Sequence, residues 1–172
     1  GLKRDFPGLK IAVHTALLDE RRAREMEAAG VDTVMMDVIG AQETIEQVYK
    51  LKRPVEDFEE TLAALASTSM EVTPHIVVGL HYGRILGEAN ALDMVSRYNV
   101  NALVLVVIMP FYARPGTFET PATSDVGRIF GEAREQLPEQ QVLLGCARPP
   151  GIPLPPGSRC RHSWRAAWWL RP

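Results

Sequence analysis

The chain has 172 residues, of which 46% are hydrophobic, and a formal net charge of −2. That length is enough for one domain with a sizeable core, and the nearly neutral charge gives no electrostatic reason to expect a nucleic-acid partner. No apolar run approaches the roughly 20 residues that span a bilayer, so we expect no membrane partner either.

Apolar runs and helical segments alternate along most of the chain. In chain order, we expect a strand at 10–14 (KIAVH), a helix at 20–29, a strand at 31–37 (VDTVMMD), helices at 43–51 and 55–66, a strand at 71–78, a helix at 85–98, a strand at 101–109 (NALVLVVIM), a helix from Thr123 or Ser124 to about Gln136, and a strand at 141–145 (QVLLG). Asp19 is expected to cap the first helix, and Thr123 or Ser124 the last. Phe58, Leu62 and Leu65 should form the buried side of the helix at 55–66.

This alternation of strands and helices predicts an α/β fold with a parallel sheet, because the strands are apolar throughout rather than every second residue. Right-handed crossovers leave two architectures, an open doubly wound sheet or an arc of a β/α barrel. Five strand–helix units cannot close an eight-stranded barrel, so the barrel interpretation implies a partial barrel, which we expect over residues 1–148.

Residues 149–172 differ in composition from the rest of the chain. Proline, arginine and tryptophan dominate, acidic residues are absent, and all three tryptophans fall here. Pro153, Pro155 and Pro156 prevent regular structure locally. We expect an irregular tail that is not native to the fold, for example through a change of reading frame; an interfacial anchor is the less favoured alternative.

Polar side chains stand at the ends of the expected strands: His14, Asp37, His75, the loop 110–117 and Arg148. In a parallel sheet these carboxyl-terminal ends lie side by side, so the residues should line one pocket and contact a small-molecule substrate. Each also has a simpler explanation, as a hydrogen-bonded core histidine, a loop-organising aspartate or a solvated arginine. His14, Asp37 and His75 together further suggest a mononuclear metal site, since imidazole and carboxylate suit Zn, Mn or Fe.

Several stretches, in order, resemble radical S-adenosylmethionine enzymes of the biotin synthase/lipoyl synthase-like branch. They are Leu17–Glu20 with Glu27–Asp32, Asp37–Gly40 with Glu43-Thr44 and Val48-Tyr49, His75–Leu80 followed by Gly87-Glu88, Met109-Pro110 with Pro115-Gly116-Thr117, and Leu144–Pro149. The stretch His75–Leu80 resembles the fifth-strand glycine motif of that family, and Glu88 the acidic residue that follows it. The resemblance covers about residues 10–151.

The resemblance implies a β/α barrel, S-adenosylmethionine and a [4Fe–4S] cluster held by a CxxxCxxC loop. Ile76, Val78, Gly79, Leu80 and Pro110 would contact the nucleoside, while the substrate would meet His14, Asp37, His75 and Arg148. The chain has only Cys146 and Cys160 and no CxxxCxxC, so no cofactor can be assigned from this chain alone. The same two cysteines are too few for a disulfide framework, which favours a cytoplasmic location.

Three hypotheses follow from these observations. The first is a fragment of a radical S-adenosylmethionine enzyme whose intact relatives insert sulfur or rearrange carbon skeletons; it would be inactive unless a complementary N-terminal barrel segment supplied the missing strands. The second is a metal-dependent lyase or epimerase using His14, Asp37 and His75. The third is a non-catalytic binding module that uses exposed sheet edges and the Trp-rich tail.

Overall fold

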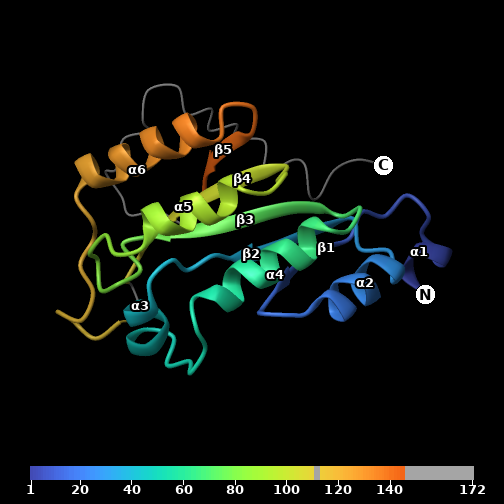
Figure 1. The fold of residues 1–172 in the computed structure, drawn as a ribbon, viewed down its shortest axis with the longest axis horizontal. Coiled ribbons are helices and arrows are strands. Elements are labelled where there is room, and N and C mark those ends of the chain that lie inside the picture. Colours follow the sequence, from blue (N-terminus) through green and yellow to red (C-terminus); the bar gives the residue numbers. More distant parts are fainter. Residues whose placement is uncertain (111–112, 146–172) are drawn as a thin grey trace.

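The structure is a computed structural model that describes residues 1–110 and 113–145 (Figure 1). The expected domain boundary at 148, Arg148 and the tail 149–172 lie outside these residues. In chain order the elements are α1 (Leu2–Asp5), β1 (Ala12–Thr15), α2 (Glu20–Ala28), β2 (Thr33–Asp37), α3 (Gln42–Gln47), α4 (Glu56–Ala66), β3 (Glu71–Val78), α5 (Glu88–Ser96), β4 (Ala102–Val107), α6 (Thr123–Gln136) and β5 (Gln141–Leu144).

The five strands form one parallel sheet in the order β1-β2-β3-β4-β5, which confirms the predicted α/β fold. Each strand pairs with the next one in the sequence. When crossovers of constant hand connect strands in sequential order, every crossover helix falls on the same side of the sheet. The topology therefore selects a partial β/α barrel over the doubly wound alternative, which needs helices on both faces.

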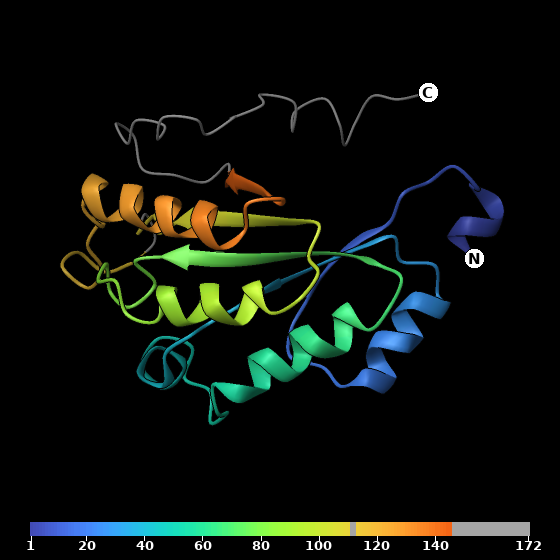
Figure 2. The ribbon, with the colours of Figure 1, turned by 45° about the horizontal axis from the view of Figure 1, so that its top comes forward.

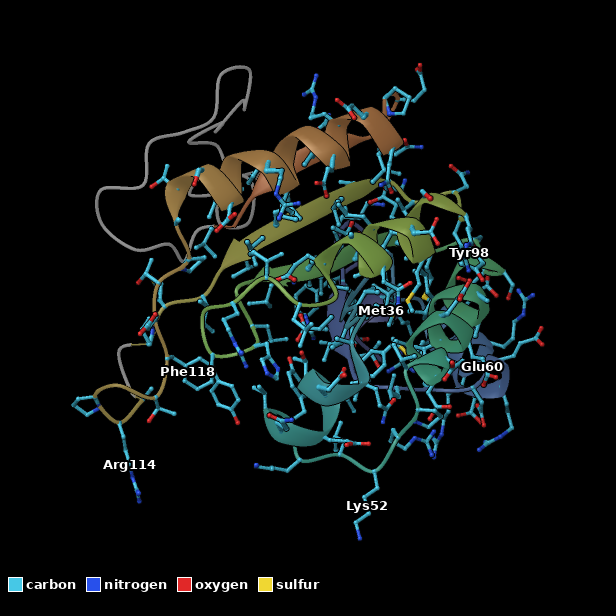
Figure 3. The ribbon with its side chains drawn as sticks, turned by 60° about the vertical axis from the view of Figure 1, so that its left-hand side comes forward. Met36, Lys52, Glu60, Tyr98, Arg114 and Phe118 are labelled. Atoms are coloured by element: carbon cyan, nitrogen blue, oxygen red, sulfur yellow. The ribbon has the colours of Figure 1, made fainter. Side chains whose placement is uncertain are left out.

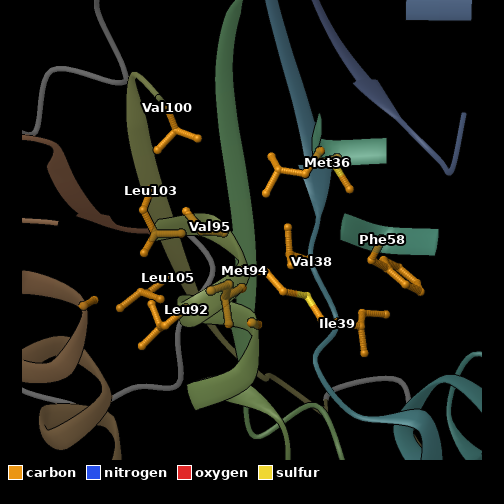
Figure 4. Close-up of a cluster of buried hydrophobic side chains, with 14 of the residues drawn as sticks. Met36, Val38, Ile39, Phe58, Leu92, Met94, Val95, Val100, Leu103 and Leu105 are labelled. Carbon is orange, nitrogen blue, oxygen red and sulfur yellow. The ribbon is translucent and has the colours of Figure 1, made fainter. Parts of the chain in front are cut away.

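Helices α2, α4, α5 and α6 line one face of the sheet (Figure 2), and successive helices contact one another. Alternate strand residues point into this layer, and Val34, Ile76 and Leu103 are almost completely buried there. They share one continuous core with helix residues such as Leu62 and Leu92. Figure 4 shows the part of this core around Leu92 and Leu103. Burying a side chain of this size stabilises the fold by about 1.5–3 kcal/mol, so this layer holds the sheet together.

The helix ends show which boundaries the local sequence predicts correctly. Asp19 caps α2 as predicted, because its carboxylate accepts the Arg22 N–H at 2.8 Å. The predicted cap of α6 is wrong: the capping position is Ala122, and no side chain there accepts a hydrogen bond. Helix α3 ends earlier than expected because Lys50 adopts a φ of 57°, which turns the chain back. The short α1 was not anticipated.

Buried residues of α4 include the predicted Phe58, Leu62 and Leu65. Helix α5 begins at Glu88 rather than near 85, because Gly87 takes a left-handed φ of 101° that a helix cannot continue. Within the described ranges, no helix combines the length and the apolar character needed to cross a bilayer.

Candidate functional site

The face of the sheet opposite the helices carries the polar side chains that the sequence singled out. Along a strand, successive side chains alternate between faces. On β2 and β3, Val34, Met36, Ile76 and Val78 belong to the helix-side core, whereas Met35, Asp37, His75 and Val77 are only partly buried. We call the second side the inner face, because it corresponds to the interior of a closed barrel.

Three of the four predicted substrate residues come together on the inner face. Asp37 on β2 and His75 on β3 are direct register partners. His14 on β1 pairs with Met35, which precedes Asp37 by two residues on β2. The His14 Nε2 lies 3.5 Å from Asp37 Oδ1, and the His75 Nδ1 lies 4.0 Å from the same oxygen. The two imidazole centroids are 5.2 Å apart. We call these three residues the His–Asp–His cluster.

Tyr49, just beyond α3, fixes the carboxylate of this cluster. Its hydroxyl donates to Asp37 Oδ2 at 3.2 Å, leaving Oδ1 facing the two histidines. Burial, followed by the neighbouring Asp37 carboxylate, raises the pKa of Tyr49 above its usual range, so the hydroxyl stays protonated and remains a donor. Sequence reasoning had noted Tyr49 only as part of the family resemblance and gave it no role.

The surroundings of the His75 imidazole favour its neutral form. Burial lowers its pKa, and the charge of His14 lowers it further, while Asp37 opposes both. The 4.0 Å separation of His75 Nδ1 from Asp37 Oδ1 is too long for a direct hydrogen bond. A neutral imidazole has a free nitrogen lone pair, which can accept a substrate proton or bind a metal ion.

The end of β3 contains a buried polar contact. Gly79, at a φ of 80°, donates its N–H to the carboxylate of Glu88 at 2.8 Å, and Glu88 is only 4% exposed. Glu88 is the first residue of α5, so its charge also faces the positive end of the helix dipole. Burial raises its carboxyl pKa, against the opposing Gly79 N–H. This contact fixes the turn that leaves the strand.

The loop after Gly79 is held by two neighbouring segments. His81 is buried and forms a hydrogen bond of 3.1 Å with Thr44 of α3. The ring of Tyr82 packs against Phe118, labelled in Figure 3, from the segment between β4 and α6. No sequence pattern indicates the His81–Thr44 pair, because the two residues are 37 positions apart and only the tertiary fold brings them together.

The predicted nucleoside contacts fall in different environments. Ile76 and Val78 lie in the helix-side core, at 1% and 0% exposure, so only their backbone groups could reach a ligand on the inner face. Leu80 packs against the core and is half-buried, as is Pro110. Val77, which was not among the predicted nucleoside contacts, does have its side chain on the inner face, where it pairs with Val106 of β4. Arg148 lies outside the described residues.

A separate groove, with a volume of about 690 Å³, lies between α2 and α4. It is lined by residues such as Asp19, Arg53, Asp57 and Glu60, on the helical side of the sheet. In β/α barrels, ligands bind at the carboxyl ends of the strands rather than between the outer helices. The inner face is therefore the better candidate site.

No protein-family model matches the chain, and no curated protein sequence matches it. Among solved structures, the chain resembles a domain of a pyruvate-formate lyase-activating enzyme from Bacteroides vulgatus, with a TM-score of 0.63 and 14% identity over 84% of this chain and 86% of that one.

The chain also resembles two hydroxymethylglutaryl-CoA lyases. The lyase from Pseudomonas aeruginosa gives a TM-score of 0.58 and 11% identity over 80% of this chain, and that from Brucella melitensis gives 0.59 and 8% over 81%. This chain spans 45% and 48% of those two chains. At these identities the likeness shows the fold alone, a partial β/α barrel.

Proposed function

We propose that the chain is the substrate-facing part of a radical S-adenosylmethionine barrel in the biotin synthase/lipoyl synthase-like branch. The observation that supports this most is the buried contact of Gly79 with Glu88. In the sequence these residues belong to the stretch that resembles the glycine motif of the family and its following acidic residue. The contact stands at the carboxyl end of β3, where a barrel enzyme binds its ligands.

The residues beside this turn fit a nucleoside. Val77 and Val106 are register partners on the inner face and offer adjacent, partly exposed apolar side chains. Ligand sites are lined mainly by apolar side chains, so this pair offers a surface against which an aromatic base can pack. When bound in the intact enzyme, S-adenosylmethionine would supply the radical-generating chemistry. The role of this chain would be to hold the adenosine against Val77 and Val106 and the substrate against the His–Asp–His cluster.

The iron–sulfur cluster does not fit the residues of this chain. Three cysteine thiolates on one loop are required, and the sequence has two cysteines 14 positions apart, Cys146 and Cys160. In this proposal the cluster would be held by a complementary barrel segment. Strand β1 pairs with β2 alone among the described strands, so its other edge is free to receive a further parallel strand from that segment.

Binding of S-adenosylmethionine to the isolated chain tests this proposal. Equilibrium dialysis should show saturable binding, and Val77→Asp should weaken it at least about 10-fold, because a carboxylate must then be desolvated against the base. Glu71→Gln is the matched control, since Glu71 lies on the same face of β3 at the opposite end. Absence of saturable binding at millimolar ligand, or equal binding by Val77→Asp, would contradict the proposal.

A metal-dependent lyase or epimerase is the second candidate function. The observation that favours it is that the ligand atoms of His14, Asp37 and His75 all lie within 4.8 Å of one another. The two candidates differ in their cofactor. The second requires a metal ion for turnover and gives S-adenosylmethionine no place, so the same dialysis experiment distinguishes them.

A further inference from the structure

The His–Asp–His cluster has the composition of a transition-metal site. It offers two imidazole nitrogens and one carboxylate oxygen from three adjacent strands, and their positions are set by the sheet register rather than by a flexible loop. Two histidines and one carboxylate form a common three-ligand set for Zn, Fe(II) and related divalent ions, with the remaining coordination positions open.

The distances between the ligand atoms are close to those that an ion requires. Bonds of about 2.1 Å in tetrahedral or octahedral geometry put the ligand atoms about 3.0–3.4 Å apart. The His14 Nε2 is already 3.5 Å from Asp37 Oδ1, and His75 Nδ1 is 4.0 Å from it. All three ligand atoms lie within 4.8 Å of one another, so small rotations of the partly exposed His14 and Asp37 side chains would bring the separations into the range that an ion requires.

Hydrogen bonding within the cluster does not account for this arrangement. A charge-assisted N–H to carboxylate bond is about 2.7–2.9 Å long, and both imidazole–carboxylate distances exceed this range. Among the described residues, the hydrogen bond that Asp37 does accept comes from Tyr49, at the oxygen that faces away from the histidines. An outer hydrogen bond to a ligating carboxylate is a regular feature of metal centres, because it fixes the orientation of the ligand.

We propose that His14, Asp37 and His75 bind one divalent transition-metal ion on the inner face of the sheet, with Tyr49 orienting the carboxylate. The ion would have open positions toward the space where a substrate lies, and it would polarise a substrate carbonyl or hydroxyl oxygen. The site goes beyond the proposed radical function, which does not require it, and the second candidate function would use it.

Titration of the purified 172-residue chain with Co²⁺ and Zn²⁺ tests the site. Co²⁺ should give the visible absorption of nitrogen and oxygen ligands without thiolate charge-transfer bands, which separates this site from any bound at Cys146 or Cys160. His14→Ala, Asp37→Asn and His75→Ala should each weaken Zn²⁺ binding at least about 100-fold, because loss of an outer partner alone costs 10–100-fold. Tyr49→Phe should cost about 10-fold by the same rule.

Glu71→Gln is again the control, because it removes a carboxylate from the same face of β3 without touching the cluster. In the unaltered chain, Zn²⁺ should also shift the ring nitrogen resonances of His14 and His75 while leaving those of His81 unchanged, so the test does not depend on the folding of any variant. Unchanged affinity in the three ligand variants, unchanged His14 and His75 resonances, or thiolate bands with Co²⁺ would overturn the proposal.

Discussion

Replacing Glu88 by glutamine or by methionine separates its hydrogen bond from its charge. Both side chains are close to glutamate in length, and both remove the ionisable group. Glutamine keeps an oxygen that can accept the Gly79 N–H, now 2.8 Å from the carboxylate, whereas methionine leaves this buried donor without a partner. An unsatisfied buried N–H costs about 1–3 kcal/mol. The glutamine NH2 would replace the buried Glu88 Oε2, which has no hydrogen-bond partner among the described residues, and this offsets part of the difference. Glu88→Met should therefore be less stable than Glu88→Gln by about 1 kcal/mol, the lower end of that range.

Urea denaturation followed by circular dichroism measures this difference, provided that the two variants have equal m-values. A difference below about 0.5 kcal/mol, within the error of such extrapolations, would refute the reasoning. It would mean that the Gly79 N–H has another partner and that Glu88 does not hold the turn at the end of β3.

The pH dependence of the free energy of unfolding provides a second test of the role of Glu88. Burial raises the carboxyl pKa of Glu88 in the folded chain, so the folded state keeps this proton to a higher pH than the unfolded state does. The stability contributed by protonated Glu88 is full below the ordinary glutamate pKa and is lost as the pH rises through the raised value. Glu88→Gln should lack this loss, so its stability relative to the unaltered chain should increase with pH across that window.

Two further predictions concern glycines and an acid-sensitive contact. Gly87→Ala should destabilise the fold by about 2–5 kcal/mol, because Gly87 has a left-handed φ and an added Cβ would lie 2.6 Å from the Ala41 nitrogen. Gly127→Ala, on the open surface of α6, should instead stabilise the fold by about 0.5–1 kcal/mol. Thermal unfolding of the two variants compares these effects, and changes of the same sign would contradict the packing described here. Asp32 accepts hydrogen bonds from Lys3, Lys10 and the Ile11 N–H, which hold its carboxyl pKa well below the usual range. Its contribution to the stability of the fold is therefore present at neutral pH and lost as the pH falls through the lowered pKa. Asp32→Asn should flatten the acid side of the plot of stability against pH, and an unchanged acid side would count against this.

Much of the fold could be predicted because the relevant signals are local. The β-branched run at 71–78 gave the bounds of β3 correctly, and the alternation of apolar strands with helices gave the parallel sheet. The face that each strand residue occupies could not be predicted. Ile76 and Val77 are equally apolar, so only the register with β2 and β4 decides that Ile76 enters the core and Val77 the inner face.

The clustering of His14, Asp37 and His75 was predictable because residues at the ends of adjacent parallel strands must lie together. The part played by Tyr49 was not, because it depends on how α3 turns back at Lys50. The His81–Thr44 pair could not be predicted either, because the two residues are 37 positions apart and only the tertiary fold brings them together. The start of α5 was also misjudged, since the left-handed Gly87 is imposed by the close approach of Ala41.

The most direct test of the proposed site is a titration of the ¹⁵N-labelled chain with S-adenosylmethionine, followed by amide chemical shifts. We expect the largest shifts at residues 76–80 and at Val106, next to the Gly79 turn, with smaller ones at Asp37 and His75. Shifts concentrated in the groove between α2 and α4, or no saturable shifts at millimolar ligand, would contradict a nucleoside site on the inner face of this sheet.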